Sequence, residues 1–265
     1  MKETKSFETI KYEVKNSTAI ITINRPQVYN ALNVQGKLDI IDGIREANKD
    51  GTVRSIILTA EGKAFCSGQD LNDRSVDATK GPVDIGHTIE TEWNPLIDAI
   101  RNSEKLVIGA ILGVCAGAGL SVALACDLKV AAPGIRFISG FSQIGLAPDA
   151  GMSFMLVRQM GYTKALEFAL LGKPLLSEDM QRYNFISRIA EDCLTTALEM
   201  AAEVNALAPL SVKMVKKNLQ FANEKELGQV LEREKHVQRF LGFSQDYKEG
   251  VTAFMEKRKP QFKGI

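Results

Sequence analysis

The chain has 265 residues, of which 45% are hydrophobic and 25% are charged. This length suits one large domain, or one domain with a helical appendage. The 33 basic and 32 acidic side chains give a net charge of +1, which argues against a nucleic-acid partner or a membrane surface. The sequence shows no signal-peptide or transit pattern and no apolar run long enough to span a membrane, so we expect a cytoplasmic protein.

Cysteines and histidines are few and do not form a metal-binding pattern. The four cysteines are Cys66, Cys115, Cys126 and Cys193. Their spacing fits no zinc site, so we expect no metal and we expect buried or half-buried thiols in a reducing compartment. His87 and His236 lie in polar segments and are expected to be exposed, although a Cys–His nucleophile remains an alternative.

Short apolar strands alternate with turns and helices up to residue 132, which predicts an α/β fold with a parallel sheet. We expect strands at 10–15, 18–24, 55–60, 106–112 and 127–132, and helices at about 33–48, 88–102 and just before Ala125. Asn16–Ser17 should turn between the first two strands, and Leu38, Ile41 and Ile44 should share one face of the first helix. The stretch of about 20 polar residues after Ala60 is expected to be irregular and to form a mobile loop over a site.

After about Asp149 the pattern becomes almost wholly helical. Ser177 resembles the start of a capping box, and the short helix that it begins leads into a strand at 186–190. Four helical stretches are then predicted between Cys193 and Lys257. The tail is amphipathic and basic, so it is either a solvated last helix or a segment that brings Phe254 and Lys257 to a ligand or a neighbouring subunit.

Three turns carry the candidate chemistry. They are FCSGQDL (65–71), VCAGAGLSVALACD (114–127) and IGLAPDAGM (144–152). The second turn begins a helix, whose first N–H groups are unpaired and whose dipole adds positive potential. One N–H from each of the first two turns would form an oxyanion hole, with Asp149 as the acid beside it. Gly-rich turns after parallel strands are common, so the pattern alone also fits a purely structural role.

Other interpretations of these turns remain open. The match of GVCAGAGLSVA to G-x-G-x-x-G is poor, because Val122 stands at the third glycine position, so we expect no nicotinamide cofactor. Asp149 could instead cap the helix that follows it. If it is an acid/base, its apolar surroundings should raise its pKa. On the helix before residue 102, we expect Glu92 and Asp98 to face solvent, with the alternative that either is an acid that supports the site from behind the reacting groups. We expect Trp93 to pack the helix.

Five segments together resemble the enoyl-CoA hydratase/isomerase (crotonase) superfamily, in the family's order and from about residue 8 to the end. They are NRPQVYNALN, KAFCSGQDL, GVCAGAGLSVALACD, FSQIGLAPDAG and EGVTAFMEKRKPQF. The resemblance implies an α/β crotonase fold, with a spiral of repeated ββα units at 1–200 and a C-terminal helical trimerisation region at 201–265. It also implies an acyl-CoA substrate, no cofactor beyond the CoA that the substrate carries, and a homotrimer or hexamer.

The resemblance assigns roles to individual positions. The oxyanion donors fall on the backbone N–H groups of Gln69 and Ala118, where the family usually has Gly at the second position. CoA contacts fall near Val28, Ala64 and Cys66, with Phe254 and Lys257 supplied from the tail. The two glutamates with which the hydratases of the family position water fall on Ser121 and Phe141, so hydratase activity is disfavoured.

Asp149 stands where several isomerases of the family carry a single acid/base. One carboxylate can take a proton from C2 of the thioester and return it further along the conjugated system. The phrases GQDLND, WNPL and DYKEGVTAF most resemble the ring-1,2-epoxyphenylacetyl-CoA isomerases of phenylacetate catabolism, which form oxepin-CoA. Met152 replaces a usual Gly and adds bulk beside the acid, which puts the aromatic substrate in question more than the reaction.

Three alternatives differ in substrate or chemistry. A Δ3,Δ2-enoyl-CoA isomerase of fatty-acid oxidation would use the same proton shift. A 4-chlorobenzoyl-CoA-type dehalogenase would use the aspartate as a nucleophile, but Phe141 stands where that group has tryptophan and His87 lies several residues early. A catalytically silent CoA-binding or RNA-binding relative is disfavoured by the retained acid and turns and by the neutral charge.

Overall fold

The computed structural model describes residues 6–73 and 84–265, so the expected mobile loop lies partly outside the described residues. A six-stranded sheet forms the centre of the fold, in the order β1-β2-β3-β5-β7-β10. Only the β1–β2 pair is antiparallel, which confirms a mainly parallel sheet. Its strands are β1 (Ile10–Lys15), β2 (Thr18–Ile23), β3 (Ser55–Ala60), β5 (Leu106–Ile111), β7 (Leu128–Ala131) and β10 (Arg188–Ile189).

The turn between the first two strands is the two-residue connection that the sequence predicts. Asn16 and Ser17 have φ angles of 50° and 61°. Two successive residues with positive φ match the right-handed twist of a hairpin, and Asn tolerates this conformation better than most residues. The turn therefore fixes the register in which Lys15 lies opposite Thr18.

A second, smaller sheet has the order β4-β6-β8-β9. Its strands are β4 (Ala64–Cys66), β6 (Val114–Ala116), β8 (Arg136–Ile138) and β9 (Leu175–Leu176). The chain passes directly from β3 to β4, from β5 to β6 and from β7 to β8, and helices follow each of these pairs. These are the repeated ββα units that the motif resemblance implies. The polar stretch after Ala60 was expected to be irregular throughout, but it contains the buried strand β4.

Helix α1 (Val34–Lys49) shows where the apolar pattern is wrong. The Asn33 side chain accepts a hydrogen bond from the Gly36 N–H at 2.8 Å and begins the helix. Leu38, expected on the buried face, is 48% exposed. The buried stripe instead contains Ile40, Ile41 and Ile44, and it begins with a lysine, Lys37, which is 1% exposed. These four positions follow the i, i+3, i+4, i+7 spacing of one helix face.

Several shorter helices connect the two sheets. The helix expected at 88–102 consists of three consecutive pieces, α2 (Ile85–Thr88), the π-helical turn η3 (Ile89–Trp93) and α3 (Asn94–Asn102). The remaining helices of this part are η1 (Pro26–Val28), η2 (Leu71–Asp73), α4 (Ala118–Ala125), η4 (Ser142–Ile144), α5 (Met152–Met160), α6 (Tyr162–Leu171) and α7 (Ser177–Arg182). None of the helices within the described residues is both long and apolar enough to cross a membrane.

Ser177 does not cap α7 as expected. It is the first helical residue, is fully buried, and donates its hydroxyl to the Ala132 carbonyl at 2.6 Å. The Asp179 carboxylate accepts the Leu176 N–H at 3.1 Å and so takes part in the cap. The hydroxyl therefore ties α7 to the segment after β7 rather than closing its own helix.

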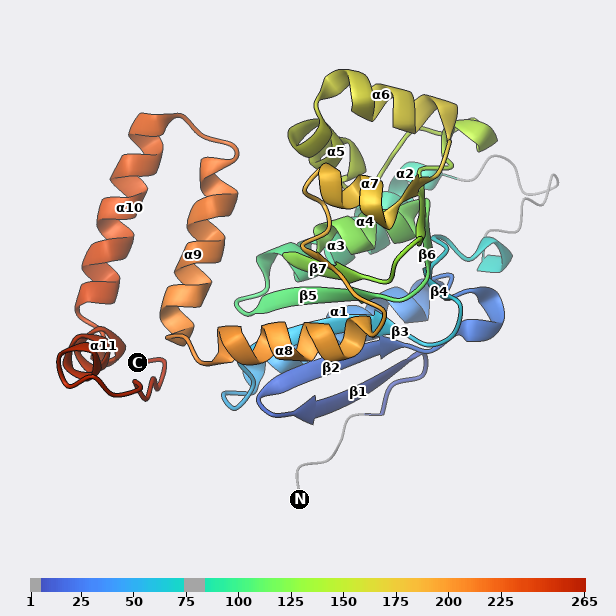
Figure 1. Ribbon diagram of the computed structural model, residues 1–265. Helices are drawn as coiled ribbons and strands as arrows, with labels where there is room; N and C mark the ends of the chain where they lie inside the picture. The colour runs from blue at the N-terminus through green and yellow to red at the C-terminus, as the bar shows by residue number, and fades with distance from the viewer. Residues whose placement is uncertain (1–5, 74–83) are drawn as a thin grey trace.

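Four helices end the chain, as predicted. They are α8 (Cys193–Asn205), α9 (Pro209–Ala222), α10 (Leu227–Gly242) and α11 (Gln245–Met255). The expected boundary at 200/201 falls inside α8, whose Ala197 and Ala201 pack with Ile57 and Ile108 of the sheet. Helices α9 and α10 stand beside each other at one end of the sheet, and α9 is the nearer of the two to the sheet (Figure 1).

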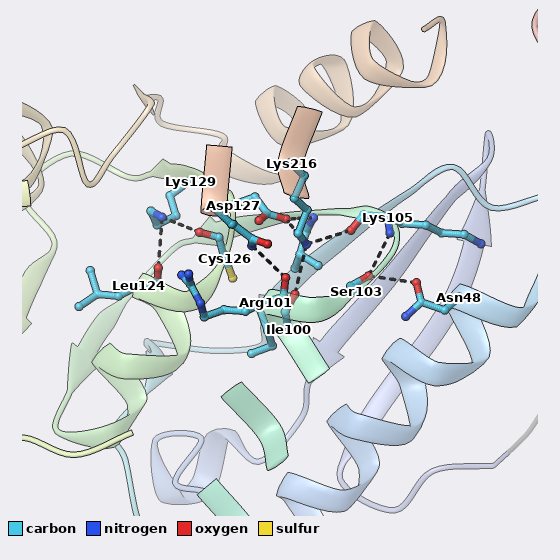
Figure 2. A network of polar contacts seen from close by, with 12 residues as sticks. Asn48, Ile100, Arg101, Ser103, Lys105, Leu124, Cys126, Asp127, Lys129 and Lys216 are labelled. Atoms are coloured by element: carbon cyan, nitrogen blue, oxygen red, sulfur yellow. Dashed lines mark hydrogen bonds and ion pairs between the residues drawn. The ribbon is translucent and has the colours of Figure 1, made fainter. Parts of the chain in front are cut away.

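A buried ion pair anchors α9 to the sheet region. Figure 2 shows Lys216 of α9 reaching between the segments that flank β5. Its ammonium lies 2.7 Å from the Asp127 carboxylate and donates to the carbonyl oxygens of Ile100 and Lys105 at 3.4 and 3.3 Å. Asp127 also accepts the Val107 N–H at 2.8 Å. The pair therefore joins α9, α3 and the start of two strands.

Candidate active site

The three candidate turns follow three neighbouring strands of the small sheet. Gln69 follows β4, Ala118 follows β6, and Asp149 follows β8 after the short η4 helix. Because β4, β6 and β8 are parallel neighbours, their carboxyl ends lie at the same edge of the sheet. Parallel sheets usually bind ligands at this edge.

The first two turns touch through their backbones. A Cβ added to Gly68 would lie 3.0 Å from the Ala116 carbonyl oxygen and 3.3 Å from the Ala118 nitrogen. A Cβ added to Gly119 would lie 2.3 Å from the Cys66 carbonyl oxygen. Gly68 also has a φ of +99°, which favours glycine. Both glycines are thus required for the turns to lie this close.

Two backbone N–H groups remain available at this contact. Neither the Gln69 N–H nor the Ala118 N–H donates a hydrogen bond to any residue that the structure describes. Ala118 is the first residue of the eight-residue helix α4, and its N-cap Gly117 provides no side-chain cap. The positive end of a helix with unpaired N–H groups attracts negative charge. The pair could hold a negatively charged oxygen.

Asp149 is tied to the helix that carries Ala118. The buried Ser121 hydroxyl, one turn further along α4, donates to the Asp149 carbonyl at 3.1 Å. The Met152 N–H donates to the same oxygen at 3.0 Å. Gly151, with a φ of 77° and no side-chain cap, is the N-cap of α5. The interpretation of Asp149 as the helix cap is therefore wrong, because the N-cap position is two residues further along the chain, at Gly151.

The positions of the family's two water-binding glutamates hold no carboxylate. Ser121 is fully buried and Phe141 is 6% exposed. The Ser121 hydroxyl already binds the backbone of Asp149, and the Phe141 ring packs in the hydrophobic core. The side chains that replace the carboxylate pair, Ser121 and Phe141, therefore both make structural contacts.

Val28, Ala64 and Cys66, the expected CoA contacts, lie close together. The segment after Val28 meets the end of β4 where the Ser67 N–H donates to the Tyr29 carbonyl at 3.2 Å. The Asn30 side chain donates to the Ala64 carbonyl at 2.7 Å. Ala64 and Cys66 are almost fully buried, so any ligand contact there would involve mainly the backbone.

Phe254 and Lys257 are not part of this cluster within one chain. Phe254 is 82% exposed on α11, and Lys257 follows that helix with a φ of 53°. Figure 1 shows α11 beyond α9 and α10, far from β4. Only a second chain could bring these two side chains to the three turns, so their role as CoA contacts stays a prediction.

The thiols are unsuited to nucleophilic chemistry. All four cysteines are free and buried, as expected. Burial raises the pKa of Cys66 and of Cys126 to about 12, and it also raises the pKa values of Cys115 and Cys193. His87 and His236 are exposed, which confirms the prediction for both. The Cys–His alternative is therefore wrong, since the nucleophile would be the thiolate.

Sequence reasoning missed the polar cluster around the Gln69 side chain. The Lys37 ammonium and the Trp93 indole N–H each donate to Gln69 Oε1 at 3.0 Å. Lys37 also pairs with Glu92, whose side chain is only 23% exposed. The expectation that Glu92 faces solvent is wrong, whereas Asp98 is exposed and Trp93 packs fully buried, as predicted. The sequence did carry a signal for the burial of Lys37, because Lys37 has the i, i+3, i+4, i+7 spacing of one helix face with Ile40, Ile41 and Ile44.

The neighbouring residue, Asp70, is held as firmly. Its carboxylate lies 2.8 Å from the Arg25 guanidinium, and both side chains are largely buried. Burial opposes ionisation of Asp70, but the Arg25 guanidinium and the Asn72 N–H outweigh it and lower its pKa. On the backbone, the Leu32 N–H donates to the Gly68 carbonyl at 2.8 Å and the Asp70 N–H to the Leu32 carbonyl at 3.1 Å. The peptide groups on both sides of Gln69 are therefore fixed.

A cavity of about 590 Å³ lies elsewhere, between α9 and the sheet region. It is lined by Arg101, Asp127, Lys129 and Lys216 among apolar side chains, and not by Gln69, Ala118 or Asp149. The volume is in the range of ligand sites, but the three turns carry the unpaired donors and the acid. We therefore place the candidate active site at the turns.

Comparison with known proteins identifies relatives of this chain. The enoyl-CoA hydratase/isomerase family matches residues 13–265. A 1,2-epoxyphenylacetyl-CoA isomerase of Escherichia coli (strain K12) is 36% identical over 97% of this chain and 99% of its own. A trans-2-decenoyl-acyl-carrier-protein isomerase of Streptococcus mutans is 34% identical over 97% of this chain and 99% of its own. The crystal structure of an enoyl-CoA hydratase from Polaromonas sp. JS666 has a TM-score of 0.90 and 32% identity, covering 96% of this chain and 99% of that one.

These matches span nearly the whole chain and include both isomerases and a hydratase. The TM-score of 0.90 agrees with the paired strands and the C-terminal helices described above. The chain therefore belongs to the enoyl-CoA hydratase/isomerase family.

Proposed function

We propose that the protein is an acyl-CoA isomerase in which Asp149 moves a proton from C2 of the acyl thioester. The backbone N–H groups of Gln69 and Ala118 bind the thioester oxygen. The observation that carries the proposal is the hydrogen bond from Ser121 to the Asp149 carbonyl, which fixes the acid relative to the helix that supplies one donor. A serine at this position also removes the carboxylate that a water-adding pair requires.

The chemistry follows from one acid and two donors. The thioester carbonyl acidifies the C2–H, and Asp149 accepts this proton while the enolate oxygen gains hydrogen bonds from the two N–H groups. Asp149 then returns the proton further along the conjugated system. Ala150 and Met152, its near neighbours in the chain, are buried and apolar, so we expect desolvation to raise the pKa of Asp149 above its ordinary value.

For the substrate, we favour ring-1,2-epoxyphenylacetyl-CoA, isomerised to oxepin-CoA in phenylacetate catabolism. The 36% identical E. coli isomerase supports this choice. The alternative is a Δ3,Δ2-enoyl-CoA isomerase of fatty-acid oxidation, which the S. mutans isomerase supports. Met152 is fully buried beside the acid, so its side chain shapes this part of the pocket. A hydratase is disfavoured by Ser121 and Phe141, although hydratases share the fold.

The assembly and ligand contacts belong to the same proposal. The enzyme works without a cofactor other than the CoA of its substrate, in the cytoplasm, as a homotrimer or hexamer. CoA lies along Val28, Ala64 and Cys66, and a neighbouring subunit supplies Phe254 and Lys257. Large exposed apolar side chains on the last helices, such as Phe243 (86%) and Phe254 (82%), support burial against another chain.

Deuterium uptake at C2 in D₂O, followed by mass spectrometry, tests the proposal. We would compare a 3-enoyl-CoA with the ring epoxide of phenylacetyl-CoA, using the wild type, Asp149→Asn and the matched control Asp98→Asn, which alters an exposed carboxylate on α3. We expect isomerised, deuterated product, reduced about 10²–10⁴-fold in Asp149→Asn and unchanged in the control. Equal activity in Asp149→Asn, or hydration of crotonyl-CoA as the dominant reaction, would refute it. The substrate that is isomerised faster indicates whether the enzyme acts in fatty-acid oxidation or in phenylacetate catabolism.

A further inference from the structure

We infer that Lys37 is a positioning residue, which holds the oxyanion donor in place by gripping the side chain of Gln69. This inference rests on the proposed role of the Gln69 N–H in binding the thioester oxygen. Lys37 is a lysine on the buried face of α1, with a side chain only 1% exposed. Burying an ammonium group is unfavourable unless it is paired and hydrogen-bonded, so its partners show what it orders.

The Gln69 side-chain oxygen receives two donors from different elements. The Lys37 ammonium comes from α1 and the Trp93 indole N–H from the π-helical turn η3, each at 3.0 Å. A carbonyl oxygen has two lone pairs, so this pair of donors saturates it. The bond from Lys37 is charge-assisted and therefore stronger than a neutral one. The side chain is thus held from two sides.

Two successive residues of the π-helical turn contact Lys37 and Gln69. Glu92 pairs with Lys37, and the next residue, Trp93, binds Gln69 and lies with its ring centroid 4.8 Å from the Lys37 ammonium. Single π-helical turns within helices occur frequently at functional sites. Glu92 balances the charge of Lys37, so the cluster acts through geometry and not through a net positive charge on the oxyanion.

A held side chain restrains the N–H because the backbone on both sides is already fixed. Leu32 bonds the Gly68 carbonyl and the Asp70 N–H, and Arg25 holds the Asp70 carboxylate. With the Gln69 side chain gripped as well, the peptide that carries its N–H has little freedom to rotate away from Ala118. Oxyanion donors contribute most when they are fixed before the charge develops.

The test measures carbonyl polarisation in a bound thioester, which does not require turnover. Hexanoyl-CoA with ¹³C at the thioester carbonyl would be studied by infrared difference spectroscopy in the wild type, Gln69→Met and Lys37→Met/Glu92→Gln, the last removing both charges together. Binding to the wild type should lower the carbonyl frequency, and both variants should show a smaller shift. Gln69→Met changes a partly buried side chain and keeps the backbone N–H, so it should fold even if the double variant does not.

Kinetics and coupling separate positioning from general stability. In both variants we expect kcat to fall by about tenfold or more. This loss should be smaller than the 10²–10³-fold that is typical when an oxyanion donor is removed, and KM should stay within about twofold of the wild-type value. In the Gln69→Met background, Lys37→Met/Glu92→Gln should add no further loss. The control Lys216→Met/Asp127→Asn removes a comparable buried pair near α9 and should leave the infrared shift unchanged.

The outcomes distinguish this inference from the proposed function. A full carbonyl shift in Lys37→Met/Glu92→Gln, or losses that multiply in the combined variant, would show that Lys37 does not act through Gln69. No shift in the wild type would overturn the inference together with the oxyanion assignment. A normal pattern of shifts without proton exchange at C2 would retain the inference and refute the isomerase proposal.

Discussion

Two buried lysine–carboxylate pairs lie in different regions of the molecule. Lys37 pairs with Glu92 beside the candidate active site, and Lys216 pairs with Asp127 where α9 meets the sheet. The lysine side chains are 1% and 3% exposed, so each carries a similar desolvation penalty. Their other partners differ.

Lys216 bonds two backbone carbonyls, and its carboxylate partner bonds a backbone N–H of β5. All of these backbone groups lie in α3 or at the start of β5, so the pair orders the scaffold of the fold (Figure 2). Lys37 bonds the side chain of Gln69, whose own N–H has no acceptor among the described residues. The role of a buried charge therefore depends on whether its partners still have a hydrogen-bonding group free for a ligand. Lys216 stabilises the fold, and Lys37 orders a potential ligand site.

The largest effect should come from separating the two turns of the active-site region. In Gly119→Ala the new methyl group would meet the Cys66 carbonyl at 2.3 Å, so Ala118 must move relative to Gln69. We expect kcat to fall about 10²-fold or more, because small displacements at a reacting centre have effects of this size. The measurement is C2 deuterium uptake. The matched control is Gly228→Ala on α10, where a Cβ meets nothing within 4 Å, and equal activities in the two variants would contradict the contact.

The second effect should appear in stability and not in chemistry. Lys216→Met leaves the Asp127 carboxylate buried without its cation, and breaking such a pair typically costs about 3–5 kcal/mol. Urea unfolding measures the loss, and C2 exchange per folded molecule should stay at the wild-type rate. A fall in this rate comparable with that of Lys37→Met/Glu92→Gln would remove the distinction between the two regions.

A third prediction uses the thiols, since each region contains one with a pKa raised to about 12, namely Cys66 and Cys126. Above pH 9 the unfolded state loses thiol protons that the folded state keeps, so the free energy of unfolding should fall as the pH rises from 9 toward 12. Denaturation at pH 8 and pH 10.5 measures this change. Cys126→Ala should show a smaller decrease than the wild type, and an identical decrease would indicate another titrating group.

The smallest effect concerns the exposed tail. Arg258 and the Gln261 N–H lower the pKa of Glu249 to about 2. A carboxylate with a depressed pKa contributes stability above its unfolded value of about 4.5, and this contribution is lost as the pH falls through 2. Hydrogen exchange at the Gln261 amide should therefore remain slow at pH 4 in the wild type. Glu249→Gln should raise this exchange rate without a measurable change in melting temperature, because exposed ion pairs contribute little.

The sequence predicts features that depend on local patterning. The strands, the Asn16–Ser17 turn and the four last helices follow from apolar periodicity and turn chemistry, and the family follows from five motifs in order. The pattern misplaced Leu38 and Glu92, because it assigns every apolar side chain to the core and every charged side chain to solvent. It also placed Ser177 and Asp149 among possible helix caps, although their oxygens bond to segments distant in the sequence.

The sequence by itself determined the fold class, the family and the identity of the candidate acid, since short-range patterns and motifs carry this information. Only the tertiary structure decided that Gly68 and Gly119 bring two backbones into contact, that Ser121 holds the Asp149 turn, and that Lys37 is buried against Gln69. These contacts join residues separated by 28 to 53 positions, such as Ser121 with Asp149 and Gly119 with Cys66. Their energies depend on burial and distance, which no local pattern encodes.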